Sequence, residues 1–493
     1  MKKLYLFFSL FSLSVIFIAC TKEDGFEKEV KGNISTSKSA GDGIYDVLGY
    51  GYDITDEFIA TNSVKKQIIN IKQFVEDYPY RFDNPFIGET ETRVFFGADA
   101  LTFMSNIRDE ANIMNSLSVF PDDFNVNNED REKSVFSGSV KFSGNNEYDY
   151  SSKYSFARGE IIKKQRQYVI DVKPDILKNY LSRNFIEDLE KISPTEIVEK
   201  YGTHFLTNIT IGGMYTANFK SAVNEETASI KKEEAIEAGL KFNFKRLGLN
   251  VENTPNQDEI EKLNNKNTEW IFNLKCIGGS TSGHTITLSP GHTEPSNTIN
   301  LGEWTQSVDD THSRLIEIDW SATYPVYELI SDPQKRAEVK KATEDYIKGK
   351  AIEVLGLVPL YQYWNDKNSD HLYSTFKGPS IAEDWIYEFP VGYILGKPAN
   401  NTVGLHQYWN ASNWDHLYST YEGENIENNW EYDFRIGYIY QEPVYGTIAL
   451  HQYWNSIRFD HLYSIYKGES IENNWKYNHI IGYIYPLCSS DSR

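Results

Sequence analysis

Acidic and imidazole side chains recur in pairs near the C-terminus of this chain of 493 residues. Each pair begins an Asp-His-Leu-Tyr-Ser segment, and the three copies start at Asp370, Asp415 and Asp460. A carboxylate beside an imidazole can perform acid-base catalysis, and the same groups can hydrogen-bond the hydroxyls of a sugar. Because three copies recur at one interval, the pattern favours architecture or repeated binding over a single catalytic centre.

The recurring aromatic and polar side chains have two possible roles. They can form a core in which Asp-His hydrogen bonds fix turns. They can instead form up to three equivalent sugar sites, with a Tyr or Trp face under the sugar ring and Asp, His or Asn on its hydroxyls. The candidate glycan-binding residues are Trp364, Asp370, His371, Tyr373, Trp409, Asp415, His416, Tyr418, Trp454, Asp460, His461 and Tyr463.

Motifs of enzymes and metal sites are missing from the sequence. It contains no His-Glu-x-x-His pair and no Gly-x-x-x-x-Gly-Lys-Ser/Thr loop. Asp366-x-Asn368-x-Asp370 begins like a calcium loop but has His371 where that loop needs Gly. We therefore expect no enzymatic activity, no cofactor and no metal. The formal charge of -21 argues against nucleic acid as a partner, because phosphate binding needs clustered Lys and Arg.

The N-terminus has the pattern of an export signal. Two Lys residues precede an apolar run that ends in Phe17-Ile18-Ala19-Cys20. This ending resembles a bacterial lipobox and predicts residues 1–20 as a lipoprotein signal peptide with Cys20 lipidated. An uncleaved anchor helix or a plain cleaved signal is the alternative. Residues 21–42 read as a flexible tether.

The residues directly after Cys20 indicate where the chain is sent. Lys22-Glu23-Asp24 resembles the acidic tag of Bacteroides-type lipoproteins that reach the outer face of the outer membrane. We therefore expect an exported outer-membrane lipoprotein, exposed on the surface or released. The two other cysteines, Cys276 and Cys488, can form a disulfide or remain thiols.

The Asp-His pairs belong to a repeat of 45 residues that fills residues 356–493. Each copy also contains a Tyr-Trp-Asn segment, a further Trp and a Gly-Tyr-Ile segment. One such unit cannot bury its own apolar face, and closing three units removes most exposed strand edges. The sequence therefore predicts an all-β module with pseudo-threefold symmetry, a β-trefoil, with a three-bladed propeller-like ring as the alternative.

Residues 43–352 have mixed helical and extended character. Helices are expected at 99–115, at 174–192 and at 194–200, where Ser193 and Glu196 have the spacing of a capping box. The chain then becomes extended, because apolar residues alternate from Phe205 to Ile211. Gly212-Gly213 follows, and glycines permit close approach of neighbouring groups.

The segment Tyr201-Gly202-Thr203-His204-Phe205, followed after six residues by Gly212-Gly213, resembles the signature of the membrane-attack-complex/perforin (MACPF) family. Residues 49–53, 271–280 and 320–346 resemble other parts of that family in the required order. The resemblance covers about 45–350. It implies an α+β fold in which a bent antiparallel sheet, like that of cholesterol-dependent cytolysins, is flanked by helical clusters, with Gly212-Gly213 where the sheet changes direction. We expect His204 to be a structural histidine.

The family mechanism implies two segments that unfurl into amphipathic β-hairpins, and a ring of subunits that closes a barrel. The first candidate lies within about 100–158, and an ordinary surface hairpin is its alternative. The second lies within about 216–268, where 225–238 looks helical and 252–268 is very polar. The candidate membrane-inserting residues are Phe136, Val140, Phe142, Phe219, Val223, Leu240, Phe242 and Phe244.

Two functions remain open from the sequence. The first is a pore-forming toxin, antibacterial or cytolytic, which binds a surface target and forms a homo-oligomeric ring on the target membrane. Its receptor would be a glycan or an outer-membrane protein. The second is a non-lytic surface lipoprotein that acts as an adhesin or glycan-binding protein.

Overall fold

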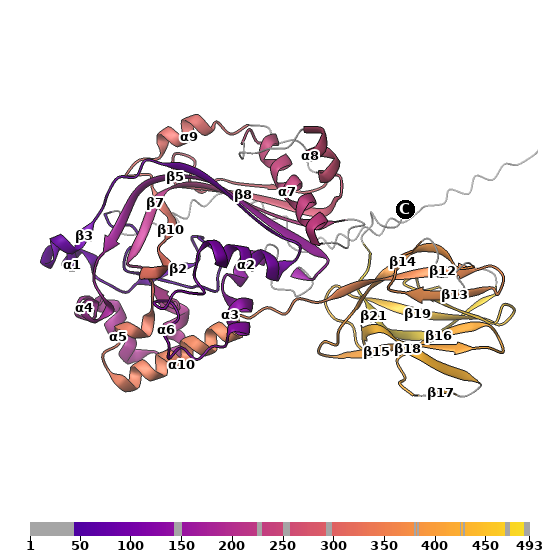
Figure 1. Ribbon diagram of the computed structural model, residues 1–493. Helices are drawn as coiled ribbons and strands as arrows, with labels where there is room; N and C mark the ends of the chain where they lie inside the picture. Colours follow the sequence, from indigo (N-terminus) through magenta and orange to yellow (C-terminus); the bar gives the residue numbers. More distant parts are fainter. Residues whose placement is uncertain are drawn as a thin grey trace, which may run out of the picture.

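The computed structural model describes residues 44–487 apart from 142–149, 224–228, 250–256, 292–297, 379–380, 382–383, 424, 427–428 and 469–473. Cys20, Phe142 and Cys488 lie outside the described residues, as do the expected signal peptide and tether. Figure 1 shows an α+β domain followed by a β module. No helix among the described residues is long and apolar enough to cross a membrane.

A seven-stranded antiparallel sheet, here called the central sheet, lies at the middle of the α+β domain. Its two long strands, β5 (Tyr154–Ile170) and β7 (Asn208–Val223), pair along almost their whole length. The shorter strands are β3 (Phe82–Asp83), β4 (Thr90–Gly97), β8 (Asn267–Ile277), β9 (Thr285–Leu288) and β10 (Arg314–Ile318). β3 and β4 pair with β5, β8 and β10 pair with β7, and β9 pairs with β8.

The central sheet changes partners at the Gly212-Gly213 pair. Gly212 is paired with β10, whereas Met214 and the residues after it are paired with β8. At the same level β5 has an irregularity between Lys164 and Arg166, and such bulges bend a strand. A Cβ on Gly212 would lie 2.0 Å from the Lys163 carbonyl oxygen, so only glycine allows this approach. The glycine pair therefore lies where the resemblance implies, at the bend.

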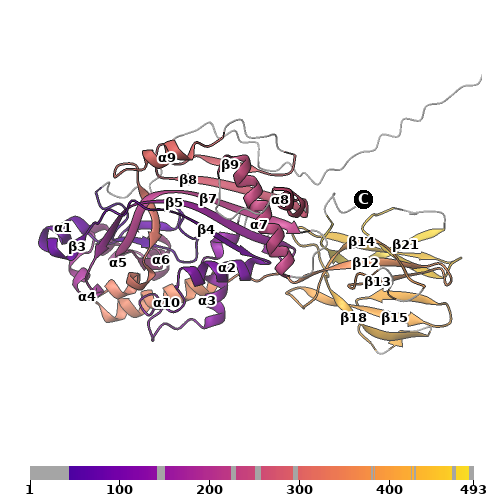
Figure 2. The same cartoon turned by 45° about the horizontal axis from the view of Figure 1, so that its top comes forward.

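Helices cover both faces of the central sheet (Figure 2). α7 (Ser229–Arg246) packs against Ala157, and α2 (Ala100–Glu110) packs against Phe156. Successive strand residues point to opposite faces, so the two helices lie on opposite sides. The other helices of the domain are α1 (Ile71–Asp77), α3 (Asn128–Ser134), α4 (Pro174–Leu177), α5 (Arg183–Lys191), α6 (Pro194–Tyr201), α8 (Gln257–Asn264), α9 (Leu301–Ser307) and α10 (Pro333–Gly349).

Local sequence signals account for several helix starts. α6 begins with the expected capping box, in which the Ser193 and Glu196 side chains each accept a hydrogen bond from the other's backbone N–H. The expected helix 174–192 is divided, because the Ser182 hydroxyl accepts from Phe185 N and caps a new helix, α5. A small second sheet is formed by β1 (Tyr50–Tyr52), β2 (Val64–Gln67), β6 (His204–Phe205) and β11 (Tyr324–Pro325), and β6 consists of two of the signature residues.

Each 45-residue repeat forms its own antiparallel sheet, in which the Tyr-Trp-Asn strand lies between the Asp-His strand and the Gly-Tyr-Ile strand. The strands in that order are β13 (Asp370–Ser374), β12 (Leu357–Asn365) and β14 (Ile386–Leu395); β16 (Asp415–Ser419), β15 (Thr402–Asn410) and β18 (Trp430–Tyr440); and β20 (Asp460–Ser464), β19 (Ile448–Asn455) and β21 (Trp475–Ile484). β17 (Asn425–Ile426) adds a short edge to the second sheet.

The β-trefoil prediction is not confirmed, and the described residues form the alternative, a three-bladed ring. Strand pairing between repeats is limited, among the described residues, to single residue pairs at Leu395–Tyr438, Tyr440–Tyr483 and Tyr393–Tyr485. The hydrogen-bonded ladders otherwise close within each repeat, which keeps the three sheets separate. We call residues 357–487 the ring module.

Replacing Gly212 by Ala tests the close approach at the bend. The added Cβ meets the Lys163 carbonyl oxygen, and we expect a loss of about 2 kcal/mol or more in the free energy of unfolding. Urea denaturation followed by circular dichroism measures it. The control is Gly302→Ala in α9, whose Cβ would have 3.5 Å to its nearest neighbour. Equal stability of the two variants would contradict the steric role of Gly212.

Candidate functional site

The first candidate segment, residues 98–153 between β4 and β5, is folded compactly in its described part. Phe136 has a left-handed backbone with φ of 60°, and Ser137–Val140 form a 3-10 helix. Phe136 and Val140 are buried in the main core. The alternating pattern at these residues is therefore neither a strand nor a surface hairpin here, because core burial of both apolar side chains outweighs the local pattern.

Residues 54–58, here called the anchor loop, hold the first segment. Phe136 N donates to Ile54 O at 2.7 Å, and Gly138 N donates to Thr55 O at 2.9 Å. The Ser139 hydroxyl accepts from Phe58 N at 3.0 Å. A Cβ on Gly138 would lie 2.4 Å from Glu57 N, so the two backbones touch at this glycine. Backbone hydrogen bonds to the anchor loop thus replace those that a hairpin would make.

The anchor loop is itself fixed to the central sheet by Glu57. The Glu57 carboxylate lies 2.8 Å from Lys275 Nζ on β8, and it accepts from Asn218 on β7 at 2.8 Å. It also lies 3.5 Å from the guanidinium of the fully buried Arg158 on β5. Burial alone would raise the pKa of Glu57, but the charges of Lys275 and Arg158 lower it below its ordinary value. One carboxylate therefore joins three strands to the loop.

The second candidate segment, residues 224–266 between β7 and β8, contains α7 and α8. The sequence predicts a helix at 225–238 and a strand-like alternation at Leu240, Phe242 and Phe244. These three residues do not form a strand in this structure, because α7 continues to Arg246. Leu240 and Phe244 lie one helical turn apart and pack together against the sheet, whereas Phe242 is half-buried. Phe219 is buried in β7, and the half-buried Val223 ends that strand.

The signature residues have structural contacts. His204 is fully buried, with Nδ1 2.9 Å from the Thr203 hydroxyl and Nε2 3.1 Å from Val119 O. Burial lowers the pKa of His204 to about 4. The Tyr201 hydroxyl donates to Asp188 at 2.6 Å, and Gly202 has φ of 81° at the end of α6. The Tyr201 contact joins α6 to α5, and among the described residues the two His204 ring nitrogens contact a hydroxyl and a backbone carbonyl.

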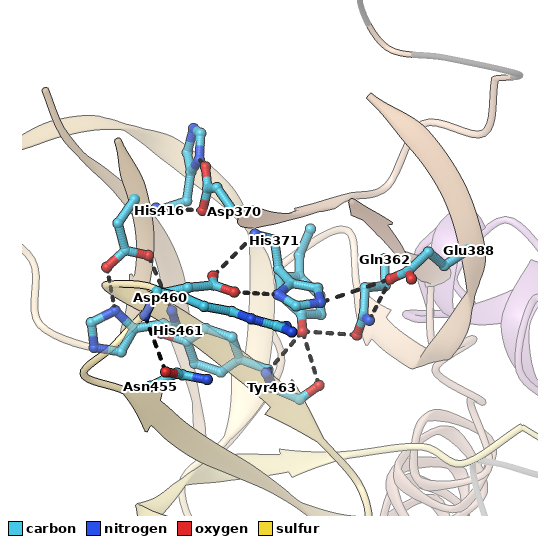
Figure 3. A network of polar contacts seen from close by, with 12 residues as sticks. Gln362, Asp370, His371, Glu388, His416, Asn455, Asp460, His461 and Tyr463 are labelled. Carbon is cyan, nitrogen blue, oxygen red and sulfur yellow. Dashed lines mark hydrogen bonds and ion pairs between the residues drawn. The ribbon is translucent and has the colours of Figure 1, made fainter. Parts of the chain in front are cut away.

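A cyclic network of Asp and His side chains surrounds the axis of the ring module (Figure 3). Each Asp lies 2.7 Å from the Nδ1 atom of a His in the next repeat, and its second oxygen accepts from that histidine's backbone N–H. The pairs are Asp370 with His416, Asp415 with His461 and Asp460 with His371. The Asp-His contacts therefore join repeats and do not fix turns within one repeat.

A second cycle is made by three buried tyrosines. The Tyr418 hydroxyl donates to Tyr373 O and accepts from Tyr373 N, and Tyr463 does the same to Tyr418. Tyr373 completes the cycle on Tyr463. The three rings meet edge to face with centroids 5.2–5.3 Å apart. Every hydroxyl and backbone group in the cycle is thus hydrogen-bonded within the ring module.

Comparison with protein families identifies the first domain. The family model for the MAC/Perforin domain matches residues 37–354, which is more than half of the chain. The chain belongs to the MAC/perforin domain family. Proteins of this family generally oligomerise and act on target membranes. A domain of unknown function, DUF5648, matches residues 327–427 and 359–485, so the ring module corresponds to a described domain without an assigned role.

Two solved structures illustrate the similarity of fold. A MAC/perforin protein from Bacteroides thetaiotaomicron, named for cell invasion, is 17% identical, with 77% of this chain and 69% of that chain covered and a TM-score of 0.48. GNIP1Aa from Chromobacterium piscinae is 13% identical, with 90% and 92% covered and a TM-score of 0.45. No match is found among curated protein sequences.

The structure corrects most of the expected sugar contacts of this MAC/perforin protein. Tyr373, Tyr418 and Tyr463 are at most 2% exposed, and Asp370, Asp415 and Asp460 at most 1%. Their polar atoms are hydrogen-bonded within the two cycles. His371 is buried, while His416 and His461 are half-buried and hydrogen-bonded to Asp. The half-buried Trp364, Trp409 and Trp454 each pack against the histidine of their own repeat, with the two rings tilted by 41–51°.

The three axial carboxylates are the group most like a metal site among the described residues. Oxygens of Asp370, Asp415 and Asp460 all lie within 4.8 Å of one another. Each carboxyl group already makes two hydrogen bonds to the next repeat, so assembly of the ring accounts for their position.

The sequence reasoning missed one aromatic position. Phe376, Tyr421 and Tyr466 follow the Asp-His strands at the repeat interval, and they are 66%, 59% and 70% exposed. The sequence does contain a signal for them, because all three repeats have an aromatic residue at this position. Their exposure contrasts with the burial of the other recurrent tyrosines.

The axial carboxylates predict a pH dependence of the ring module. Burial, and then the charges of Asp370 and Asp460, raise the pKa of Asp415 to about 9, far above about 4 in the unfolded chain. The folded state therefore holds this proton more tightly, and stability falls as the pH rises from about 4 to about 9. Burial lowers the pKa of His461 to about 4, so its opposite effect is confined to pH about 4–6.5.

Between pH about 6.5 and 9 we therefore expect the ring module to lose stability, by at most about 1.4 kcal/mol per pH unit from Asp415. Asp415→Asn removes the ionisable group and should flatten this slope. Tryptophan fluorescence during thermal unfolding follows the module, since seven of the ten Trp residues lie beyond residue 356. Equal slopes for the wild-type chain and the variant would contradict a protonated Asp415.

Proposed function

We propose that this MAC/perforin protein is a pore-forming toxin, antibacterial or cytolytic. The ring module binds a surface target, the chain assembles into a homo-oligomeric ring, and the two candidate segments insert as amphipathic β-hairpins. The proposal includes export as an outer-membrane lipoprotein through Cys20, with surface exposure or release, and it assigns the chain no enzymatic activity.

The observation that carries the proposal is the pair of compact segments at the ends of the long strands. Each segment joins two neighbouring strands of the central sheet, β4 with β5 and β7 with β8. Each is long enough for two spanning strands of about 9–11 residues. Both bury apolar side chains, Phe136 and Val140 in the first and Leu240 and Phe244 in the second. Straightening them would continue the existing strands and expose these side chains to lipid.

The anchor loop supports the proposal that the first segment is held in a folded state before it inserts. The first segment is held by hydrogen bonds to Ile54, Thr55 and Phe58, and none of these belongs to the segment itself. Release requires these contacts to break together with those to other parts of the domain, such as Asn125 N to the Glu344 carboxylate and the Ser137 hydroxyl to Lys350 O, while the central sheet keeps its ladder. The Glu57 contacts to three strands let the loop remain in place as the segment leaves.

Dye leakage from vesicles made of susceptible-cell lipids, with electron microscopy of the same vesicles, tests the proposal. We expect leakage together with ring-shaped particles. The absence of both on every susceptible membrane would refute pore formation.

A reversible tether tests segment release within that assay. The Ser137 hydroxyl and Gly138 N both donate to Thr55 O. Thr55→Cys with Ser137→Cys therefore places one thiol on the anchor loop and one on the first segment. In a Cys276→Ser background, we expect the oxidised protein to lose at least about tenfold in leakage rate and to recover on reduction. The Ser137→Cys single variant controls for the substitution. Full leakage by the double-cysteine variant, with its disulfide verified, would contradict release of this segment.

The exposed aromatics of the ring module favour a second candidate, a non-lytic adhesin or glycan-binding lipoprotein. It predicts surface binding without leakage. The polar composition of residues 252–268, which includes α8, supports it, because polar residues suit a lipid-facing strand poorly.

A further inference from the structure

The three repeats of the ring module share one position at which a large aromatic ring is left exposed by folding. Phe376, Tyr421 and Tyr466 occupy equivalent positions and are all more than half exposed. A scattered exposed aromatic is ordinary, but a threefold recurrence on one module indicates a surface kept for contact.

These aromatics are held in place by buried tyrosines. In the second repeat, the Tyr408 hydroxyl donates to Tyr421 O at 2.8 Å and accepts from Gly423 N at 3.2 Å. Tyr363 and Tyr453 make the same contacts to Phe376 and Tyr466. A Cβ on Gly423 would lie 2.4 Å from the Tyr421 ring, so the ring lies directly over this glycine. An aromatic fixed before binding loses little entropy when a ligand stacks on it.

A groove of about 500 Å3 lies beside Tyr421, between the second and third repeats. This volume falls within the range of small-molecule sites, about 300–1,000 Å3. Its walls combine the Tyr421 ring and Ile480 with polar side chains of Ser419, Thr420, Gln452 and His479. Gln452 is held by hydrogen bonds to Tyr463 and Asn478. The groove thus offers an aromatic face with several hydrogen-bonding groups around it.

The groove has the chemistry of a site for a neutral sugar. Among the described residues its lining includes no Asp, Glu, Lys or Arg, so none of these residues pairs with a sialic acid, sulfate or phosphate group. An apolar ligand would leave the polar groups of Thr420 and His479 without partners. A pyranose ring satisfies both requirements, because its C–H face stacks on an aromatic ring while its hydroxyls bond polar side chains.

The three repeats differ at this groove although they agree at the axis. The positions equivalent to His479 hold Phe389 and Phe434, and those equivalent to Ile480 hold Pro390 and Arg435. The Asp, His and Tyr residues of the two axial cycles are identical in all three repeats. Only the groove between the second and third repeats combines a phenol with an imidazole, so the grooves are not equivalent.

We propose that the groove between the second and third repeats binds a neutral pyranose unit of a surface glycan, with Tyr421 as the stacking face and His479 and Thr420 on the hydroxyls. This inference rests on the proposed role of the ring module in target binding. The proposed sugar site lies on the outside of the ring, whereas the sequence pattern pointed to the axial Asp, His and Tyr residues.

An array of immobilised glycans with neutral hexose or N-acetylhexosamine ends, beside sialylated and sulfated ones, tests the inference with the full chain. We expect binding to at least one neutral glycan. Tyr421→Ala should weaken that binding about tenfold or more, since truncating a central Tyr commonly costs more than 1 kcal/mol. Tyr421→Phe keeps the ring and should stay within about threefold of wild type.

The matched control is Tyr445→Ala, since Tyr445 is 68% exposed in the same module but outside this groove. It should bind as wild type does, and thermal unfolding should show that all variants are folded. Binding to no neutral glycan, binding only to acidic glycans, or equal binding by Tyr421→Ala would each overturn the inference.

Vesicle leakage separates this inference from the proposed function. A chain that binds a neutral glycan through Tyr421 but never causes leakage would refute pore formation and support the sugar site. A chain that causes leakage but gives any of the three overturning results would support pore formation and refute the sugar site.

Discussion

The backbone ladder between β5 and β7 is the interaction on which the rest of the MAC/perforin domain depends. It runs from Tyr154 opposite Ala222 to Val169 opposite Asn208, and every other strand of the central sheet except β9 pairs with β5 or β7. Its side chains divide the domain into two layers, since Phe156 faces α2 while Ala157 faces α7. Because both candidate segments begin or end on this pair, any change in them takes place beside a fixed ladder.

Contacts at one end of the ladder connect the two parts of the chain. Ser152, just before β5, donates its N–H to Leu355 O, and its hydroxyl accepts from Leu357 N at 2.8 Å. Lys153 lies over the ring of Tyr393 in the first blade. The first segment ends at these residues, so the place where the ring module joins the domain is also where that segment meets β5. In the proposed function, target binding by the module would therefore act close to the part of the sheet where the first segment begins its release.

Signals confined to a few neighbouring residues could be read from the sequence, and contacts across repeats could not. The capping box at Ser193 and the glycine pair at Gly212 are local, and both have the expected place. The 45-residue period predicted three equivalent units, but it carried no information on whether Asp415 bonds within its repeat or to His461 in the next. Knowledge of the ring closure was needed to decide that, and with it whether Tyr418 is core or binding surface.

The candidate membrane-inserting segments show a different limit of sequence-based prediction. Leu240, Phe242 and Phe244 fit the period of a strand, while Leu240 and Phe244 also share one face of a helix. Packing against the central sheet selects the helix in this state, and no local pattern could indicate that choice. The same residues can satisfy both periods, which is the property that a segment needs if it is helical before insertion and extended afterwards.

Fluorescence of an environment-sensitive dye attached to single cysteines at positions 240 to 244 measures that change most directly. In protein bound to a susceptible membrane, positions 240, 242 and 244 should enter lipid while 241 and 243 remain in water. Such a period of two is that of a strand with one face in the bilayer. If the dye stays in water at all five positions, or keeps the helical pattern in which 240 and 244 differ from 242, the second segment does not insert as a β-hairpin.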